Sequence, residues 1–323
     1  MKIFLVLTID VEPDCSRNWS YSNPLQFEGI SNGIAEKLQP LFIDHGIVPT
    51  YLINNVVLEN APSVDVLRKL PGKYELGTHL HPEFMEPEKE FYDYAGKKAE
   101  KNCCYYPGAI ESEKITNITH LFVNAFGYRP TSFRAGRFSA GNNTMASLRK
   151  SGYLVDSSVT PHILWNDSSR EIPIDYRQAP QQPYFMSQRN FLEQNAGGDL
   201  LQVPVSIGLN KRNIIKELLA SGAGLLHPVR KYKPIWLRPF YSRTKEMIGL
   251  VREFMKTYQD QEWMVLNMMF HNVEVLPGIS PYTQTENECR QYLRQLKDFF
   301  IFCQQEKIQS VALSQLYDIF RKK

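Results

Sequence analysis

Short apolar segments that alternate with longer amphipathic segments constrain the fold of this chain more than any other feature. Eight segments are rich in apolar or β-branched residues without strict alternation, which is typical of parallel strands covered on both faces. They span residues 2–8, 48–53, 75–79, 131–134, 154–157, 200–205, 264–270 and 308–312. Helical patterns span residues 31–45, 63–70, 111–126, 142–151, 212–220, 244–258, 284–306 and 313–321. This order predicts a parallel sheet, either closed as a barrel or doubly wound.

Glycines mark the ends of several predicted helices. Gly46, Gly127 and Gly152 each follow a helical pattern and precede an apolar run, where a left-handed residue commonly ends a helix. No linker rich in Pro, Gly or Ser interrupts the chain, so we expect one domain over residues 1–323. The least regular stretch, residues 179–243, is interpreted as an insertion or lid.

The composition is that of an ordinary globular protein. Of the 323 residues, 43% are apolar and 22% are charged, so the chain can form a core and disorder is excluded as its main state. Lys and Arg (37) nearly balance Asp and Glu (34), which does not indicate a nucleic acid partner. The five cysteines include no C-x-x-C pair, so we expect reduced thiols and no thiolate zinc site.

The N-terminal apolar run is interpreted as a buried strand and not as a signal peptide. It stops at Asp10, and no small-residue cleavage site follows. No stretch approaches about 18 uninterrupted apolar residues, so no transmembrane segment is predicted. We therefore expect a cytoplasmic protein, with peripheral attachment to a membrane left open.

Unusual polar residues occur at one consistent place, the carboxyl end of the predicted strands. Five strand ends carry Asp10 and Glu12; His79, His81 and Glu83; Arg134 and Arg137; Asp156; and His271. In a (β/α) barrel this end carries the active site, with residues from several strands. Each residue alone has a structural alternative, such as a helix cap, an ion pair or a satisfied core histidine. Their joint placement favours a catalytic centre.

Residue spacing indicates a metal site at this centre. Residues two apart in an extended strand point to the same side, so Asp10 and Glu12 can face one point, and so can His79 and His81. Two imidazoles with one or two carboxylates are a ligand set for Zn²⁺ or another divalent first-row metal.

At these residues the sequence resembles the polysaccharide deacetylase family, the NodB-like carbohydrate esterases of family 4, and is similar to a divergent bacterial branch of it. The family's first motif is Thr-Phe-Asp-Asp; here Thr-Ile-Asp ends at Asp10 and Glu12 follows two residues later. The family's histidines are four residues apart, whereas His79 and His81 are two apart and Glu83 has the four-apart position. The resemblance implies an α/β fold, a distorted (β/α) barrel of about seven to eight parallel strands.

The resemblance also implies roles for the strand-end residues. The catalytic set is Asp10, His271, Arg134 and Asp156, and the metal ligands are Glu12, His79 and His81, with Glu83 as a substitute for His81. Asp10 would be the general base, kept ionised by Arg134. His271 would be the general acid, with its tautomer fixed by Asp156. The metal is expected to be Zn²⁺, with Co²⁺, Ni²⁺ or Mn²⁺ as alternatives.

The implied function is metal-dependent hydrolysis of N-acetyl groups, or O-acetyl groups, on a sugar or polysaccharide precursor. Two alternatives stay open: a non-catalytic module that binds a glycan or a partner protein, and an amidohydrolase of a small non-sugar amide. Arg137, Trp165 and Trp236 are candidate substrate-binding residues. Residues 229–245, which are basic and aromatic, predict either a lid over an anionic glycan precursor or a solvated loop.

Overall fold

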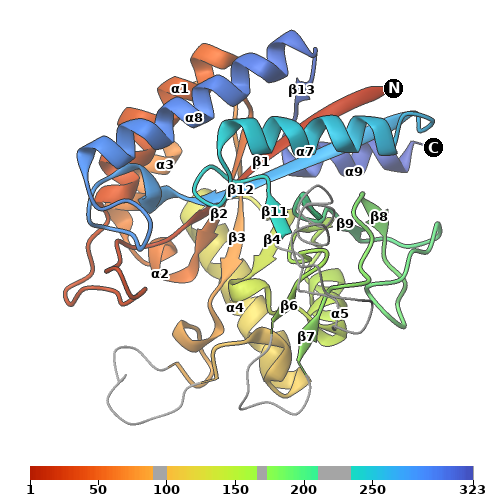
Figure 1. Cartoon of the computed structure of the whole chain (residues 1–323). Helices are drawn as coiled ribbons and strands as arrows, with labels where there is room; N and C mark the ends of the chain where they lie inside the picture. Colours follow the sequence, from red (N-terminus) through yellow and green to blue (C-terminus); the bar gives the residue numbers. More distant parts are fainter. Residues whose placement is uncertain (90–99, 166–172, 210–233, 323) are drawn as a thin grey trace, which may run out of the picture.

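A curled sheet of nine strands forms the centre of the molecule in the computed structural model (Figure 1). The structure describes residues 1–89, 100–165, 173–209 and 234–322. The strands are β1 (Lys2–Val11), β2 (Pro49–Asn54), β3 (Glu75–Leu80), β4 (Ser132–Ala135), β5 (Val155–Asp156), β8 (Tyr184–Phe185), β9 (Leu201–Gln202), β12 (Trp263–His271) and β13 (Gln309–Ser310). Their order is β12-β1-β2-β3-β4-β5-β9-β8, and β13 pairs with β1.

Neighbouring strands of this sheet are parallel, apart from the antiparallel pair β8–β9. Beyond β9 the chain returns to β12, where the Ser206 N–H donates to the Asn267 carbonyl oxygen at 3.0 Å. This contact brings the two ends of the parallel part together, so the sheet curls into a distorted barrel. The predicted α/β fold is confirmed.

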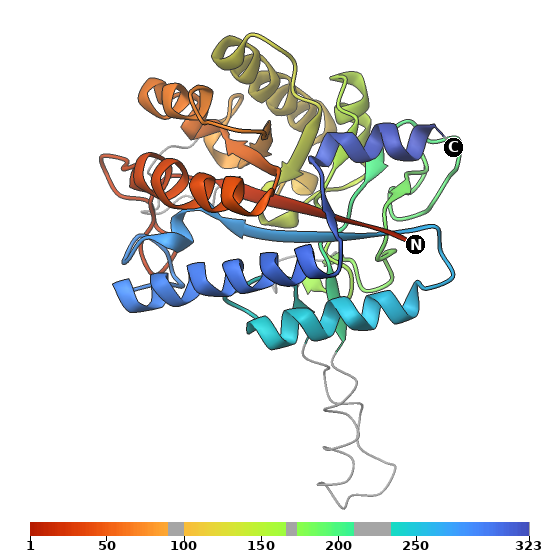
Figure 2. The ribbon, with the colours of Figure 1, turned by 90° about the horizontal axis from the view of Figure 1, so that it is seen from above.

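Helices surround the sheet. They are η1 (Gly29–Leu38), α1 (Gln39–His45), α2 (Asn55–Leu58), α3 (Ala61–Arg68), α4 (Gly108–Phe126), α5 (Asn142–Lys150), α7 (Thr244–Thr257), α8 (Glu286–Gln305) and α9 (Leu313–Arg321), with the short turns η2 (Pro82–Phe84), η3 (Cys103–Tyr105), η4 (Gly136–Phe138) and η5 (Asn272–Val275). Seen from above, α3 and α4 lie on one side of the strands and α7 and α8 on the opposite side (Figure 2). Their apolar faces bury the outer side of the sheet.

All eight predicted strands are present, with boundaries that differ by a few residues. The difference matters most at β1, which continues through Asp10 instead of ending before it. The predicted helix over residues 31–45 is divided into the π-helical η1 and α1, because Pro40 lacks the N–H that an unbroken α-helix needs. Gly46 and Gly127 end α1 and α4 in the left-handed conformation, as predicted. The predicted helix 212–220 lies outside the described residues.

Part of the predicted insertion belongs to the barrel, because β8 and β9 join the main sheet. β10 (Ile207–Leu209) and β11 (Pro234–Trp236) form an antiparallel pair, as do β6 (Leu164–Trp165) and β7 (Ile174–Asp175). Residues 210–233 lie outside the described residues, and they include the first five residues (229–233) of the predicted basic lid. The single-domain boundary stays a prediction.

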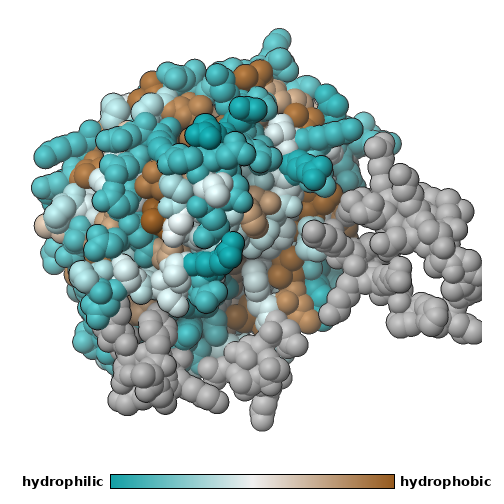
Figure 3. Space-filling view, turned by 60° about the vertical axis from the view of Figure 1, so that its left-hand side comes forward, coloured by the Kyte–Doolittle hydropathy of each residue, from teal (hydrophilic) through white to brown (hydrophobic). Residues whose placement is uncertain are grey.

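In the described ranges, no helix is both long and apolar enough to cross a bilayer. On the face drawn in Figure 3, apolar residues are scattered in small groups among hydrophilic ones. All five cysteines are free thiols in the structure.

One carboxyl group is buried away from the strand ends. Glu111, in the first turn of α4, is 1% exposed. Its Oε1 accepts a hydrogen bond from the Thr144 hydroxyl, and its Oε2 has no partner among the residues that the structure describes. Burial raises the pKa of Glu111 to about 7. Because the unfolded chain loses this proton at lower pH than the folded protein does, folding becomes less favourable as pH rises through this range.

Glu111→Gln should remove this loss of stability. The free energy of unfolding of the parent, relative to that of the variant, should fall by about 3 kcal/mol between pH 4.5 and pH 7. Urea denaturation across this pH range measures the difference, and Glu113→Gln, at an exposed position of the same helix, is the matched control. Parallel pH profiles for the parent and Glu111→Gln would contradict the assignment.

Candidate active site

The strand register explains why the polar strand ends meet. Asp10 on β1 is paired with His271 on β12, and His79 on β3 is paired with Arg134 on β4. The carboxyl ends of parallel strands lie on one side of a curled sheet, and alternate residues point into its interior. These side chains are therefore collected in one place although they are far apart in the sequence.

The Arg134 side chain extends into the interior of the barrel and is fully buried. Its Nη1 donates to Asp10 Oδ1 at 2.6 Å, and its Nη2 donates to the hydroxyls of Thr8 at 2.7 Å and Ser157 at 2.9 Å. Its Nε donates to the Ser157 carbonyl oxygen at 2.8 Å. A buried cation needs this combination of a counter-charge and hydrogen-bond acceptors. The pairing of Arg134 with Asp10 that the resemblance implied is present.

Glu12, His79 and His81 direct three atoms at one point. Glu12 Oε1 lies 3.1 Å from His79 Nε2 and 3.0 Å from His81 Nε2, and the two nitrogens are 3.1 Å apart. All three side chains are buried, and together they can hold a metal ion. The Tyr21 hydroxyl donates to the other Glu12 oxygen at 2.9 Å, which fixes the carboxylate.

The contacts behind this cluster suit a metal. His79 Nδ1 lies 3.1 Å from the Arg134 carbonyl oxygen. A carbonyl can only accept, so Nδ1 carries the proton and Nε2 presents its lone pair. Metal-binding histidines commonly make this outer hydrogen bond. Two imidazole nitrogens and one carboxylate oxygen therefore fit a divalent cation, which would replace the proton that these atoms otherwise share.

Glu83 lies behind His81 and not with the three inner atoms. Its Oε1 accepts a hydrogen bond from Arg137 Nη2 at 2.6 Å and is 3.6 Å from His81 Nδ1. Arg137 also donates to the Lys101 carbonyl oxygen at 2.9 Å, and its backbone is left-handed, with φ of 53°. Arg137 thus fixes Glu83. Of the two alternative ligands, the geometry favours His81, and the proposed contact of Arg137 with substrate stays a prediction.

Opposite charges outweigh burial at both inner carboxylates. Burial alone would raise the pKa of Asp10, but the Arg134 guanidinium holds it below its usual value. Burial also opposes ionisation of Glu12, yet the charge of His81 holds its pKa well below the usual range. At His81, burial lowers the pKa but Glu12 raises it to about 9. Asp10 and Glu12 are therefore ionised at neutral pH.

Glu274 orients His271, in the role that the sequence analysis gave to Asp156. Glu274 Oε1 accepts hydrogen bonds from the Nδ1 and the backbone N–H of His271, both at 2.9 Å. The Nε2 of His271 then faces the centre, 4.0 Å from Asp10 Oδ2 and 3.9 Å from Glu12 Oε1. Within the described ranges, the carboxylates within 4.0 Å of His271 are those of Asp10, Glu12 and Glu274.

Asp156 is hydrogen-bonded to Ser158, which contacts the end of β4. Its two oxygens accept from the Ser158 hydroxyl at 2.6 Å and the Ser158 N–H at 2.9 Å, and Ser158 Oγ accepts from the Ala135 N–H at 2.9 Å. Burial raises the pKa of Asp156 to about 6. The expectation that Asp156 fixes the His271 tautomer is therefore corrected. Glu274 lies in the turn that directly follows β12, the strand that ends at His271, whereas Asp156 lies on β5, which is not adjacent to β12 in the sheet.

Sequence reasoning missed the residues that support Glu274. Arg238 donates to Glu274 Oε1, and its Nη2 lies 3.1 Å from His271 Nδ1. The Tyr292 hydroxyl donates to Glu274 Oε2 at 2.8 Å. The position of Glu274 three residues after His271, at the end of a strand, is a signal that could have found it. Arg238 and Tyr292 are distant in sequence, and no local pattern identifies them.

The two predicted substrate-binding tryptophans lie in an aromatic group beside Arg134. Trp165 stacks on Phe138 at a centroid distance of 5.8 Å and lies 6.3 Å from Trp236. The Phe138 ring is 5.6 Å from the Arg134 guanidinium. The Trp165 Nε1 donates to the Thr160 hydroxyl at 2.9 Å. Their contact with substrate stays a prediction.

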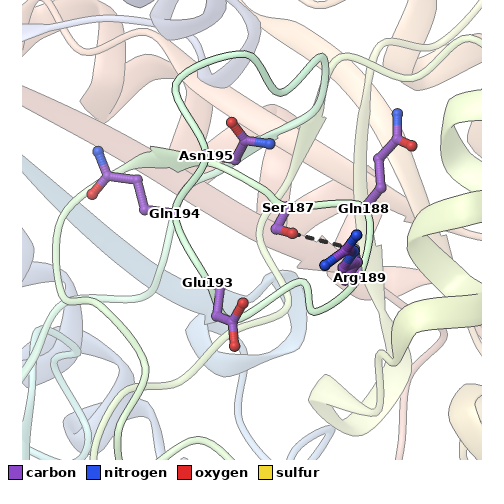
Figure 4. Close-up of a pocket in the computed structure, with 6 residues that line it drawn as sticks. All are labelled: Ser187, Gln188, Arg189, Glu193, Gln194 and Asn195. Carbon is purple, nitrogen blue, oxygen red and sulfur yellow. Dashed lines mark hydrogen bonds between the residues drawn. The ribbon is translucent and has the colours of Figure 1, made fainter.

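A pocket lies on the connection between β8 and β9 and has no lining residue in common with the strand-end cluster (Figure 4). Its lining consists of Ser187, Gln188, Arg189, Glu193, Gln194 and Asn195. Most of these side chains are exposed, and the Ser187 hydroxyl accepts from the Arg189 N–H at 3.2 Å within the loop. The strand-end cluster is therefore the better candidate for chemistry.

Solved structures share this fold over almost the whole chain. The protein is similar to one described as a polysaccharide deacetylase from Mycobacterium smegmatis, with a TM-score of 0.57, 12% identity and coverage of 99% of this chain and 91% of that one. A second, described as a polysaccharide deacetylase from Pseudomonas aeruginosa PAO1, gives a TM-score of 0.56, 14% identity and coverage of 99% and 91%. The chain has the fold of the NodB-like polysaccharide deacetylases.

The polysaccharide deacetylase fold also occurs with another activity. Puue allantoinase matches with a TM-score of 0.54, 14% identity and coverage of 98% of this chain and 89% of that one. No protein-family model and no curated protein matches the sequence. Because one fold can serve several reactions, the function must be argued from the site.

Arg134→Met should destabilise the protein by about 3–5 kcal/mol, because it leaves Asp10 buried without its counter-charge. Adding Asp10→Asn to this variant should restore part of the loss. Urea unfolding at neutral pH measures both effects. Arg177→Met is the control, because the ion pair of Arg177 with Asp175 lies at the surface and should contribute little to stability. Equal stability of Arg134→Met and this control would contradict the account.

Proposed function

We propose that this protein is a metal-dependent hydrolase that removes N-acetyl groups from a sugar or polysaccharide precursor. The observation that carries the proposal is the meeting of three groups at one edge of the barrel: the Glu12, His79 and His81 cluster, the Asp10–Arg134 pair, and His271. Each supplies one function that amide hydrolysis needs, namely a metal, a base and an acid. The polysaccharide deacetylase fold supports the proposal.

Glu12, His79 and His81 would hold the ion, expected to be Zn²⁺. When bound, it would polarise the acetyl carbonyl and lower the pKa of a water molecule from ~15.7 toward ~7. Asp10 would accept the proton that this water loses as it attacks. Arg134 fixes Asp10 Oδ1, while Oδ2 lies 3.9 Å from His79 Nε2 and 4.0 Å from His271 Nε2, on the side of the cluster.

His271 would protonate the departing amine. Its Nδ1 is bonded to Glu274, so Nε2 is the atom that can give the proton. Glu274 would stabilise the imidazolium, and Arg238 and Tyr292 would keep Glu274 in place. The products are acetate and the free amine of the sugar. Glu274 is thus a positioning residue that acts through His271.

A second candidate is hydrolysis of a small non-sugar amide, which the structural likeness to an allantoinase favours. The same base, acid and metal ligands would serve both reactions, so a panel of substrates separates them. A non-catalytic binding module is the less favoured alternative, because Asp10, Arg134 and His271 keep the contacts that catalysis would need.

His271→Ala should lower kcat for acetate release by about 10²–10⁴-fold while bound metal is retained, because His271 would donate a proton and is not among the three ligands. Acetate is assayed on N-acetylglucosamine, its oligomers and an O-acetylated sugar, with allantoin hydrolysis measured beside them. His120→Ala, on an exposed part of α4, is the matched control and should keep full activity.

Full turnover by His271→Ala would contradict the proposed role of the histidine. Hydrolysis of allantoin without any release of acetate would replace the deacetylase proposal with the second candidate.

A further inference from the structure

We propose that exposed aromatic side chains beside His271 bind the sugar ring next to the acetylated one, so that the substrate is an uncharged oligosaccharide. These side chains, here called the aromatic rim, are Trp19, Phe240, Tyr241 and Tyr282. The inference rests on the proposed function and adds the class of substrate.

The aromatic rim is exposed and continuous. Trp19 is 38% exposed, Phe240 46% and Tyr241 45%, which makes them three of the few large hydrophobic residues that face solvent in the described ranges. Tyr282 connects them, with centroid distances of 5.5 Å to Trp19, 4.5 Å to Phe240 and 5.8 Å to Tyr241. Contiguous exposed apolar groups of this kind commonly mark a binding surface.

Trp19 places one end of the aromatic rim against His271, the proposed general acid. The centroids of the Trp19 and His271 rings are 4.8 Å apart, with an angle of 61° between the rings. His271 Nε2 lies within 4.0 Å of both Asp10 and Glu12. A glycan that brings its acetamido group to these atoms would have its next ring beside Trp19.

The position of Trp19 is built into the loop that carries it. The backbones of Cys15 and Tyr21 form an isolated antiparallel β-bridge across this loop. Within the loop, the Trp19 N–H donates to the Ser16 carbonyl oxygen at 3.0 Å. Trp19 itself has φ of 59°, a left-handed conformation that is uncommon for a bulky residue and that the surrounding contacts must maintain. Tyr21, from the same loop, bonds Glu12. One loop therefore holds both a metal-ligand candidate and the aromatic rim.

The charges beneath the aromatic rim are already paired, which favours an uncharged ligand. The Arg238 guanidinium lies 4.7 Å from the ring centroids of both Tyr241 and Tyr282. It is buried and bonded to Glu274, so its charge is compensated. The hydroxyls of Tyr241 and Tyr282 are 3.1 Å apart. The aromatic rim therefore offers ring faces and neutral hydroxyls, which suit the C–H face and the hydroxyls of a sugar.

Isothermal titration calorimetry with N-acetylglucosamine and its dimer and tetramer tests this, with acetate measured in the same samples. The tetramer should bind at least about tenfold more tightly than the monomer. Trp19→Ala and Phe240→Ala should each weaken tetramer binding by about three- to tenfold and change monomer binding by less than about twofold. Tyr128→Ala, at an exposed tyrosine outside the aromatic rim, is the control and should change neither constant.

Three results would overturn the inference. The first is equal affinity for the monomer, the dimer and the tetramer, or no binding of any of them. The second is binding by the Trp19→Ala and Phe240→Ala variants that equals binding by the control, and the third is tighter binding of UDP-N-acetylglucosamine than of the tetramer. The acetate measurement separates this failure from that of the proposed function. Acetate release with no dependence on length keeps the deacetylase and removes the rim site. Rim-dependent binding without acetate release keeps the rim site and removes the deacetylase.

Discussion

A guanidinium buried inside the barrel sets the conditions for the rest of the structure. The positive charge and the N–H groups of Arg134 need partners inside the barrel. These partners are Asp10 and Thr8 on β1 and Ser157 after β5. Asn267 of β12 extends the network, since it accepts from the Thr8 hydroxyl at 3.1 Å and donates to the Ser157 hydroxyl at 2.8 Å. A small barrel fills its interior with side chains, and here those at the carboxyl edge are polar and mutually bonded.

This buried network gives the strand-end residues distinct chemical environments. One oxygen of Asp10 is fixed by Arg134, and the other faces the histidines. The Arg134 backbone carbonyl fixes the His79 tautomer, so the same residue prepares both the proposed base and a proposed metal ligand. His271 is held separately, through Glu274 on the following turn. The proposed base, metal ligands and acid are thus held in place by their neighbours, which is the form of preorganisation that catalysis requires.

Local sequence patterns predicted the parts of the fold and site that local physics determines. Apolar runs predicted the parallel strands, and the period of two in a strand predicted that His79 and His81 face one side. Contacts that depend on the assembled barrel were not accessible in this way. Glu274 took the role expected of Asp156, and the aromatic rim joins Trp19 to residues more than two hundred positions away. Neither the order of the motifs nor hydrophobic periodicity contains that information.

Metal analysis of the purified protein tests the central claim most directly. The parent, His79→Ala and the exposed-site control His120→Ala would be dialysed against a trace mixture of divalent metals and analysed for bound elements. The account predicts about one equivalent of a divalent first-row metal in the parent and the control, and almost none in His79→Ala. A parent protein without metal, or a His79→Ala variant that retains a full equivalent, would contradict it.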